Sequence, residues 1–340
     1  MKLYAFIFLC FLVSCQSQKD QYVCKPCDLL CDEITFLEAG NCPHCKMELI
    51  KKNELVSKEL VLNQIDIKEG SGIFIIEGGF EKESIIGVHY HKPKNFSLNS
   101  SVIFVLPGAG RNGNDYRDAW IEKSEKYSVL ILSLEYSKKY YPGLWSYNLA
   151  GMIDNVNIKD KTFSIYQNQE KWVFGDFDRI FNQVKKNLNL EKEHYDMFGH
   201  SAGGQLLHRL AIFHPKNMAN RIMASNSGWY TLPANDEQFP YGLDAINIKE
   251  KDVDFSPKLT LFLGEKDNAD ETRGDIRHTP EADKQGLHRL ARGKYFYKLS
   301  KETAIKQGAE FNWKLKVISG IGHDYRGMSR AAAEYLYGND

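Results

Sequence analysis

The chain has 340 residues, 43% of them hydrophobic and 26% charged, and its 44 basic and 44 acidic side chains give a net charge of zero. Such a chain can bury one large core and leave room for a small appendage. Charges of both signs are scattered along the sequence, so no basic face is indicated and no nucleic-acid partner is expected. Beyond the N-terminal segment, no stretch is long and apolar enough to cross a membrane.

The N-terminus contains an apolar run from Leu3 to Val13 that follows Lys2. A membrane-spanning helix needs roughly 20 apolar residues, and this run is shorter. The pattern is typical of the core of a signal peptide, which we expect to occupy residues 1–14 and to be removed on export.

The end of this run, Leu12-Val13-Ser14-Cys15, resembles a bacterial lipobox. The resemblance implies that Cys15 is acylated, becomes the first residue of the mature protein and anchors it in a membrane, with residues 15–21 as a tether. Gln16 and Ser17 follow in place of an acidic residue, which favours the outer membrane of the bacterial cell envelope. The alternative is an ordinary signal peptide whose cysteine falls at the cleavage site by chance.

After the tether, all cysteines lie within residues 22–51. Cys24-x-x-Cys27 and Cys42-x-x-Cys45, with roughly fourteen residues between them, have nearly the spacing of a zinc ribbon. Two such knuckles offer four thiolates in the tetrahedral arrangement that suits Zn²⁺. We therefore predict a zinc-ribbon-like segment with a structural zinc ion held by Cys24, Cys27, Cys42 and Cys45. Disulfides are the alternative in an oxidising compartment, although the odd number of cysteines argues against a purely disulfide scheme.

The same segment resembles the short heavy-metal-binding ribbons at the ends of metal-efflux proteins, through Tyr22-Val23-Cys24 and Cys42-Pro43-His44-Cys45-Lys46-Met47-Glu48-Leu49. It departs from them at Lys25-Pro26-Cys27, where a Met-His pair is usual, and at Lys46, where glycine is usual. These departures weaken an inference of metal sensing or transport. Cys31 is a spare thiol that could replace a ligand of the first knuckle.

The charged residues 52–69 are expected to form a linker or helix, and from Gly70 the sequence changes to short apolar runs at regular spacing. Ile73–Ile76 and Ile85–Tyr90 are expected to pair as antiparallel strands. Further strand-like runs are Val102–Leu106, Val129–Leu132, Tyr195–Phe198, Arg221–Ala224, Leu259–Leu263 and Leu315–Ile318. Helices are expected at Asp115–Tyr127, Trp172–Leu188, Gln205–Phe213, Glu281–Arg292 and Ser329–Tyr337. This alternation predicts an α/β fold over residues 70–340, with a mostly parallel sheet between helices.

The sequence Gly199-His200-Ser201-Ala202-Gly203 follows a predicted strand and opens a predicted helix, which is the context of a nucleophile elbow. A serine on so sharp a turn needs glycine two residues away on either side, because side chains there would collide. The helix that begins after Ser201 directs its free N–H groups toward the reacting oxygen. We predict Ser201 as a nucleophile; the alternative is a serine that merely caps a helix.

A nucleophilic serine needs a base, and the base needs an orienting carboxylate. In elbow-containing hydrolases they follow in the order Ser, acid, His. His323 lies in a glycine-rich loop after a predicted strand and is the best-placed base. Asp267, in the loop after Leu259–Leu263, is the predicted acid, with Asp270 as the main alternative and Glu265 as a weaker one.

An oxyanion hole needs two backbone N–H groups. One is expected from Ala202, directly after the predicted nucleophile. The other is expected from the loop Pro107-Gly108-Ala109-Gly110, where small residues let the backbone approach a substrate carbonyl. Ala109 or Gly110 is the predicted donor, and the alternative is a simple tight turn.

From about Gly70 to Tyr337 the chain resembles α/β hydrolases of the esterase type, nearer to polyhydroxybutyrate-depolymerase-like and feruloyl-esterase-like members than to peptidases. The residues that carry the resemblance are the elbow around Ser201, the loop that begins at Pro107, Asp267 and His323. The resemblance implies the α/β-hydrolase fold, ester hydrolysis through an acyl-enzyme, and no organic cofactor for catalysis.

The substrate is indicated only by aromatic residues near the predicted carboxyl ends of strands, where ligands bind in open α/β sheets. Trp145, Tyr147, Trp229 and Tyr230 are predicted to contact substrate, such as a carbohydrate-linked or polymeric ester. Packing beneath a long loop is the alternative for these side chains. Two other functions stay open: a serine exopeptidase with the same triad, although no charged anchor for a peptide terminus is identifiable, and a non-enzymatic metal-binding or docking lipoprotein.

Overall fold

A computed structural model describes residues 21–24, 34–51, 60–79, 84–157, 159–160, 162–166, 168–246 and 248–338. The predicted signal peptide, Cys15, Cys27 and Cys31 lie outside these ranges. The chain divides into two compact units, Met1–Glu59 and Leu60–Asp340. None of the helices in the described ranges is long and apolar enough to cross a lipid bilayer.

The first unit contains a three-stranded antiparallel sheet with the order β2-β1-β3. Its strands are β1 Tyr22–Val23, β2 Thr35–Phe36 and β3 Ile50–Lys51. A tight turn follows Cys42, whose amide donates to the carbonyl oxygen of Met47 over 2.8 Å. Cys24, Cys42 and Leu49 are buried together and form the small core of this unit.

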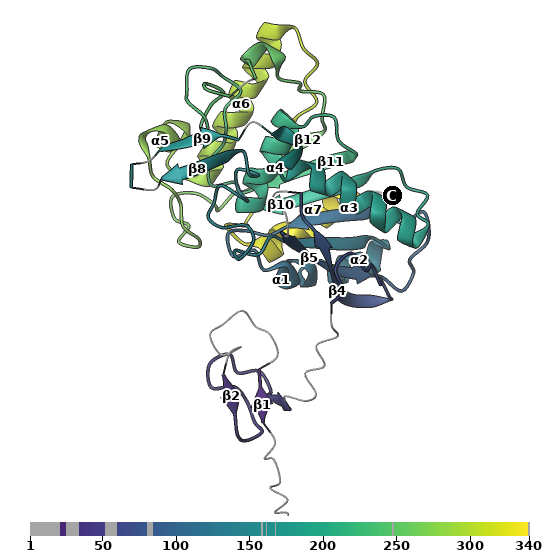
Figure 1. The fold of residues 1–340 in the computed structure, drawn as a ribbon. Helices are drawn as coiled ribbons and strands as arrows, with labels where there is room; N and C mark the ends of the chain where they lie inside the picture. Colours follow the sequence, from purple (N-terminus) through teal and green to yellow (C-terminus); the bar gives the residue numbers. More distant parts are fainter. Residues whose placement is uncertain are drawn as a thin grey trace, which may run out of the picture. The chain divides into compact units, whose positions relative to one another are not determined.

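The second unit is built on an eight-stranded sheet with the order β13-β12-β11-β10-β6-β7-β5-β4 (Figure 1). Strands β6, β7 and β10 to β13 are parallel, and β4 and β5 form the antiparallel hairpin that the sequence predicts. The strands are β4 Gly70–Glu77, β5 Ile85–Lys92, β6 Val102–Leu106, β7 Leu130–Glu135, β10 Tyr195–His200, β11 Ala219–Ser225, β12 Leu259–Gly264 and β13 Lys314–Ile318. Every predicted strand is therefore present.

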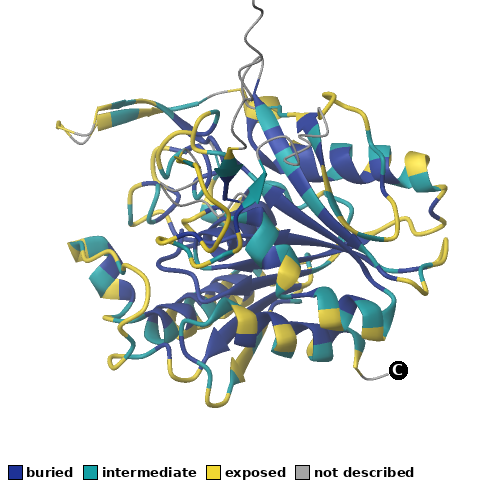
Figure 2. Cartoon of the chain, turned by 90° about the horizontal axis from the view of Figure 1, so that it is seen from below, coloured by how far each residue is buried: buried dark blue, intermediate teal, exposed yellow. Residues whose placement is uncertain are grey.

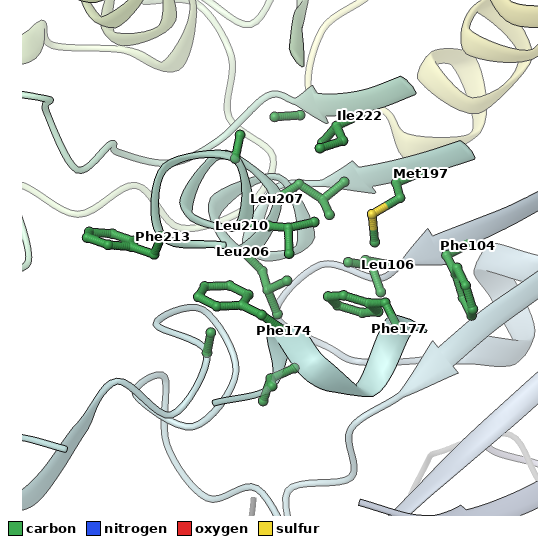
Figure 3. Packing of buried hydrophobic residues seen from close by; sticks show 14 of the residues in the cluster. Phe104, Leu106, Phe174, Phe177, Met197, Leu206, Leu207, Leu210, Phe213 and Ile222 are labelled. Atoms are coloured by element: carbon green, nitrogen blue, oxygen red, sulfur yellow. The ribbon is translucent and has the colours of Figure 1, made fainter. Parts of the chain in front are cut away.

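Helices pack on both faces of this sheet, whose strands are the most buried part of the unit (Figure 2). They are α1 Gly113–Asp118, α2 Ile121–Tyr127, α3 Phe174–Leu188, α4 Ala202–Phe213, α5 Pro280–Gln285, α6 Arg289–Gln307 and α7 Tyr325–Tyr337. Neighbouring residues of a strand point to opposite faces. Phe104 and Leu106 of β6 thus join the core formed with α3 and α4 (Figure 3), whereas Ile103 and Val105 join the core formed with α7.

A long segment between β7 and α3 adds elements that the sequence pattern did not predict. It contains the antiparallel hairpin of β8 Ile153–Asn157 and β9 Thr162–Ile165, followed by a 3₁₀ helix, Gln169–Lys171. A second 3₁₀ helix, Glu250–Asp252, precedes β12. Their short, mostly polar sequences lack the apolar periodicity that marks buried elements.

Two predicted helices are each divided in the structure. The helix expected over residues 115–127 is interrupted near Trp120, whose side chain is 1% exposed and packs edge-on against Phe198. The helix expected over residues 281–292 breaks at Gly286, with φ 137°, a conformation that favours glycine. The second part, α6, then continues to Gln307.

Part of the segment expected as a linker belongs to the second unit, which begins at Leu60. The amide of Asn63 donates to the carbonyl oxygen of Ile75 over 2.9 Å, and Ile67 is buried in the main core. Residues 60–69 form no helix. Ile65 and Ile67 pack in the main core, whereas the apolar residues at positions 60–62 are exposed.

Candidate active site

Ser201 lies on a sharp turn between β10 and α4, with φ 56° and ψ −112°. Such a conformation of a non-glycine residue costs about 1–3 kcal/mol and persists only where the surroundings hold it. The amide of Ser201 donates to the carbonyl oxygen of Ser225 on β11 over 2.9 Å, and its carbonyl accepts from the amide of Gln205 over 2.9 Å. The predicted nucleophile is therefore fixed at the carboxyl end of a central parallel strand.

The glycines of this turn are required by packing. A Cβ on Gly199 would lie 2.5 Å from the carbonyl carbon of Gly203, and a Cβ on Gly203 would lie 2.2 Å from the carbonyl oxygen of Leu106. A Cβ on Gly204 would lie 2.5 Å from the carbonyl oxygen of Ser225. A side chain at any of these positions would collide with backbone atoms. This is the steric reason for the glycines of the turn.

The loop after β12 brings Asp267 to His323. His323 Nδ1 lies 2.8 Å from Asp267 Oδ2, and Arg289 Nη1 lies 3.2 Å from Asp267 Oδ1. Asp267 is 1% exposed, and these two partners offset the loss of water around its charge. Asp270, the alternative acid, is exposed, and its backbone amide donates a hydrogen bond to Asn268 Oδ1. Within the described structure, Asp270 forms no hydrogen bond with His323.

Two further carboxylates hold the loop that carries His323. Glu271 accepts a hydrogen bond from the amide of His323 and pairs with Arg273 over 2.7 Å. Hydrogen bonds from Arg273 hold the pKa of Glu271 well below its usual range, against the opposing effect of burial. Glu265 accepts from the amide of Gly320 over 2.8 Å. Glu265, the weaker alternative for the acid, thus holds the loop in place through its backbone.

His200 packs against His323, with ring centroids 4.5 Å apart. Burial lowers the pKa of His200 well below its usual value, and repulsion from the protonated form of His323 and from the charge of Arg289 adds to the effect. Its imidazole is therefore neutral and enclosed, with Tyr116 Oη 3.3 Å from Nδ1. Ser201 and His323, both in the described structure, do not hydrogen-bond to each other. Catalytic hydrogen bonds commonly tighten only when substrate binds.

The two sides of the predicted oxyanion hole lie next to Ser201. Ala202 is the first residue of α4, where the amide has no acceptor within the helix. A Cβ on Gly108 would lie 3.5 Å from Ser201 Cβ, so the loop after β6 passes beside the serine. Ala109 lines the same cavity as Ser201 and Ala202, whereas Gly110 is exposed outside that lining.

A cavity of about 370 Å³ opens beside Ser201. Its apolar wall includes Leu144 and Trp229. Apart from Ser201, its polar lining consists of side chains that sequence reasoning missed, namely Arg111, Lys138, Asn148, Gln205, Asp275 and Arg277. They come from loops and helix ends far apart in the chain, and no short motif marks them.

Of the four aromatic side chains predicted to contact substrate, only Trp229 lines this cavity. Tyr147 is 0% exposed, and its hydroxyl donates to the carbonyl oxygen of Pro107 over 2.7 Å, which supports the loop beside the serine. Tyr230 is also fully buried and stacks on an aromatic ring of α6. Trp145 is partly buried against the core. For these three residues, the alternative of packing describes the structure better.

In the first unit, the sulfur atoms of Cys24, Cys42 and Cys45 lie within 4.8 Å of one another, with 3.6 Å between those of Cys24 and Cys45. Zinc–sulfur bonds of about 2.3 Å in a tetrahedron would separate sulfurs by about 3.8 Å, so the donor set fits a metal. Cys42 and Cys45 are free thiols. Burial opposes ionisation of Cys42, but hydrogen bonds, the largest from Cys24, outweigh it and lower its pKa to about 6. Cys27, the fourth predicted ligand, lies outside the described residues.

No protein-family model and no curated protein matches the chain. Among solved structures, the chain is similar to poly(aspartic acid) hydrolase-1 from Sphingomonas sp. KT-1, with 34% identity, a TM-score of 0.73, and coverage of 80% of this chain and 100% of that one. It is also similar to LpqC, a poly(3-hydroxybutyrate) depolymerase from Bordetella parapertussis, with 28% identity, a TM-score of 0.72, and coverage of 80% and 92%. These similarities confirm the fold that the sequence predicts. The chain is a hydrolase and belongs to the α/β-hydrolase family together with these two enzymes.

Proposed function

We propose that the chain is a serine hydrolase that cleaves carboxylic ester bonds through an acyl-enzyme, with Ser201 as nucleophile, His323 as base and Asp267 as the orienting acid. The observation that carries this proposal is the strained conformation of Ser201 beside a cavity and a glycine-containing loop. The buried contact of His323 with Asp267 supports it. This chemistry requires no cofactor.

In the acylation step, Ser201 Oγ attacks the ester carbonyl while His323 Nε2 takes the hydroxyl proton. The imidazolium is stabilised by Asp267, to which Nδ1–H donates. The carbonyl oxygen becomes an oxyanion, for which the amides of Ala202 and of Ala109 or Gly110 are the proposed donors. The alcohol then leaves with the proton from His323, and the acyl group stays on Ser201.

In the deacylation step, a water molecule gives its proton to His323 Nε2 and attacks the acyl carbonyl. Collapse of the second tetrahedral intermediate breaks the bond to Ser201 Oγ, which regains the proton, and the carboxylic acid is released. Arg289 touches neither substrate nor water in this scheme. It balances the charge of Asp267 in a buried site, which a lone carboxylate would occupy at high cost.

The proposed substrate is an oligomeric or polymeric ester, or an ester linked to carbohydrate. The two similar enzymes are named for polymers, one joined by ester bonds and the other by amide bonds. Trp229 supports binding of an extended chain, because its ring lines the cavity and is held by the guanidinium of Arg209, 4.3 Å from the ring centroid. Cleavage of a terminal peptide bond by the same triad is the alternative.

For the N-terminal part we propose a lipid anchor on Cys15, export to the bacterial cell envelope, outer membrane included, and a structural zinc ion. The lipobox-like sequence supports the anchor and the location. The close sulfur atoms of Cys24, Cys42 and Cys45 support the metal, with Cys27 as the fourth ligand by its spacing. A zinc ion with four thiolates has no open position for water, so its proposed role is to fold the small unit.

The test of the proposed activity is a pH-stat assay of the chain on p-nitrophenyl butyrate, a linear trimer of 3-hydroxybutyrate and an unblocked tripeptide. We expect hydrolysis of both esters, no hydrolysis of the tripeptide, and loss of ester hydrolysis in Ser201→Ala. Cleavage of the tripeptide alone would favour the exopeptidase. Ester hydrolysis that is equal in Ser201→Ala would contradict the proposed nucleophile.

A further inference from the structure

The cavity beside Ser201 is lined by three basic side chains, Arg111, Lys138 and Arg277, and by one carboxylate, Asp275. The chain as a whole has a net charge of zero. The surplus of positive charge is therefore a local property of the site. These charges line the same cavity as Ser201, where a reacting substrate would bind.

The side chain of Arg111 is bonded to the backbone of a neighbouring segment. It is 5% exposed and donates to the carbonyl oxygen of Tyr136 over 3.0 Å and to those of Tyr141 and Gly143. These bonds fix the segment that carries Lys138 along the wall of the cavity. Arg111 thus supports the segment that carries the neighbouring lysine, with three of the five N–H groups of its guanidinium bonded to backbone carbonyl oxygens.

Lys138 and Arg277 are exposed, and in the described structure neither forms a hydrogen bond or an ion pair. Some surface cations of the chain have carboxylate partners instead. Lys126 lies 3.2 Å from Glu334, for example. Two unpaired cations that face one cavity lower the energy of an anion inside it, and the low-dielectric wall concentrates their field.

The segment that carries Arg277 is tied to the proposed catalytic acid. Arg289 donates through Nη2 to the carbonyl oxygens of Gly274 and Asp275, over 2.9 Å each, while its Nη1 contacts Asp267. A buried guanidinium therefore joins the proposed acid to the loop whose residues 275–277 line the cavity. This connection gives Arg277 a defined position relative to the reacting atoms.

We propose that Lys138 and Arg277 bind a carboxylate of the substrate, so that the preferred substrate is an ester with a free carboxylate a few bonds from the scissile carbonyl. This inference rests on the proposed function, because it assumes that Ser201 is the reacting group. A guanidinium binds a carboxylate through two parallel hydrogen bonds, and an ammonium contributes a point charge. Asp275, in the same lining, repels a second anion and limits the subsite to one carboxylate.

The test compares kcat/KM for two matched pairs of esters. In the first pair the charge is on the acyl side: the p-nitrophenyl hemiester of glutarate against p-nitrophenyl pentanoate. In the second it is on the alcohol side: carboxymethyl butyrate against ethyl butyrate. We expect a preference of about fivefold or more for the anionic member of at least one pair, the upper range for an exposed ion pair. The preference should fall when salt rises from about 0.1 M to about 1 M, because the Debye length shortens from roughly 10 to 3 Å.

The variants are Lys138→Gln, Arg277→Gln and the double variant, with Lys139→Gln as the matched control. Lys139 is the next residue, is exposed, and lies outside the cavity lining over the ring of Tyr140. We expect the double variant to lose the preference, because its kcat/KM falls more for the anionic member of a pair than for the neutral member, and Lys139→Gln to behave as wild type. Equal kcat/KM within both pairs, or a preference unchanged in the double variant, would overturn the subsite. Neither result would contradict the proposed function, which fails only if the neutral esters are not hydrolysed through Ser201.

Discussion

The carboxylate of Asp267 is held between two side chains, with Oδ1 3.2 Å from Arg289 Nη1 and Oδ2 2.8 Å from His323 Nδ1. The side chains of Asp267 and Arg289 are 2% and 3% exposed. The charge of the carboxylate is thus balanced inside the protein on one oxygen, while the other oxygen is left to orient the imidazole.

This arrangement predicts that Asp267→Asn lowers kcat by roughly 10³–10⁴-fold, because an amide favours the wrong tautomer and orientation of His323. Asp270→Asn is the matched control, since Asp270 is exposed in the same loop. Steady-state kinetics on a small ester measure both. If Asp270→Asn is the damaging change and Asp267→Asn is silent, the acid is wrongly assigned.

Arg289 is expected to be a positioning residue. Arg289→Gln leaves Asp267 buried without its cation, and breaking such a pair costs about 3–5 kcal/mol in the free energy of unfolding. It also frees the loop that carries Arg277, so selectivity between anionic and neutral esters should fall with kcat. Urea unfolding and the matched ester pairs measure the two effects. Lys294→Gln, an exposed change on the same helix, should alter neither.

A purely structural role of Arg289 would reduce stability and leave the ester selectivity of the folded fraction unchanged. Arg289→Lys separates the two contributions further. An ammonium keeps the charge but cannot reproduce the fork that reaches Asp267 and the carbonyl oxygens together. We expect Arg289→Lys to recover part of the stability and less of the selectivity.

Glu271 should make stability depend on pH in the acid range. Its pKa is depressed in the folded state, chiefly by Arg273, so its ionised form stabilises the fold. That stabilisation is fully present well above the unfolded value of about 4.3 and is lost as the pH falls through and below it. The free energy of unfolding of wild type should therefore exceed that of Glu271→Gln by about 1 kcal/mol or more near pH 7, with a smaller difference near pH 4. A difference that stays constant across this range would contradict the assignment.

The sequence predicted the features of the site that are local. The elbow around Ser201 depends on residues within a few positions of one another, and its glycines report a steric need that the turn imposes by itself. The central strands β6, β7, β10 and β12 are also visible as apolar runs, because strands buried on both faces need apolar side chains nearly throughout. Asp267 and His323 could be proposed because each follows a predicted strand.

The remaining parts of the site depend on contacts between distant segments. Arg289 reaches Asp267 across 22 residues and Glu271 reaches His323 across 52, and nothing in their local sequence distinguishes them from surface charges. Tyr147 and Tyr230 are aromatic residues of the kind that often contacts substrate, but tertiary packing buries them. Lys138 and Arg277 are ordinary loop cations until the fold brings them to one cavity.

The cysteine cluster is expected to be separable from the chemistry. If it holds zinc, a chelator should release about one zinc per chain and expose the first unit to proteolysis, because metal binding supplies the folding energy of so small a unit. Hydrolysis of a small soluble ester should be nearly unchanged. Cys42→Ser should mimic chelation by both measures. Loss of ester hydrolysis on chelation would place the metal in the catalytic machinery and refute the separation.

The central claim is that Ser201 is the covalent nucleophile, and a fluorophosphonate probe followed by peptide mass spectrometry tests it most directly. The account predicts a single added phosphonyl group on the peptide that contains Ser201, with loss of ester hydrolysis in proportion to labelling. The Ser201→Ala variant should take up no probe and retain the free energy of unfolding of wild type within about 2 kcal/mol. Undiminished labelling of Ser201→Ala, or a label on another serine that tracks the loss of activity, would contradict the account.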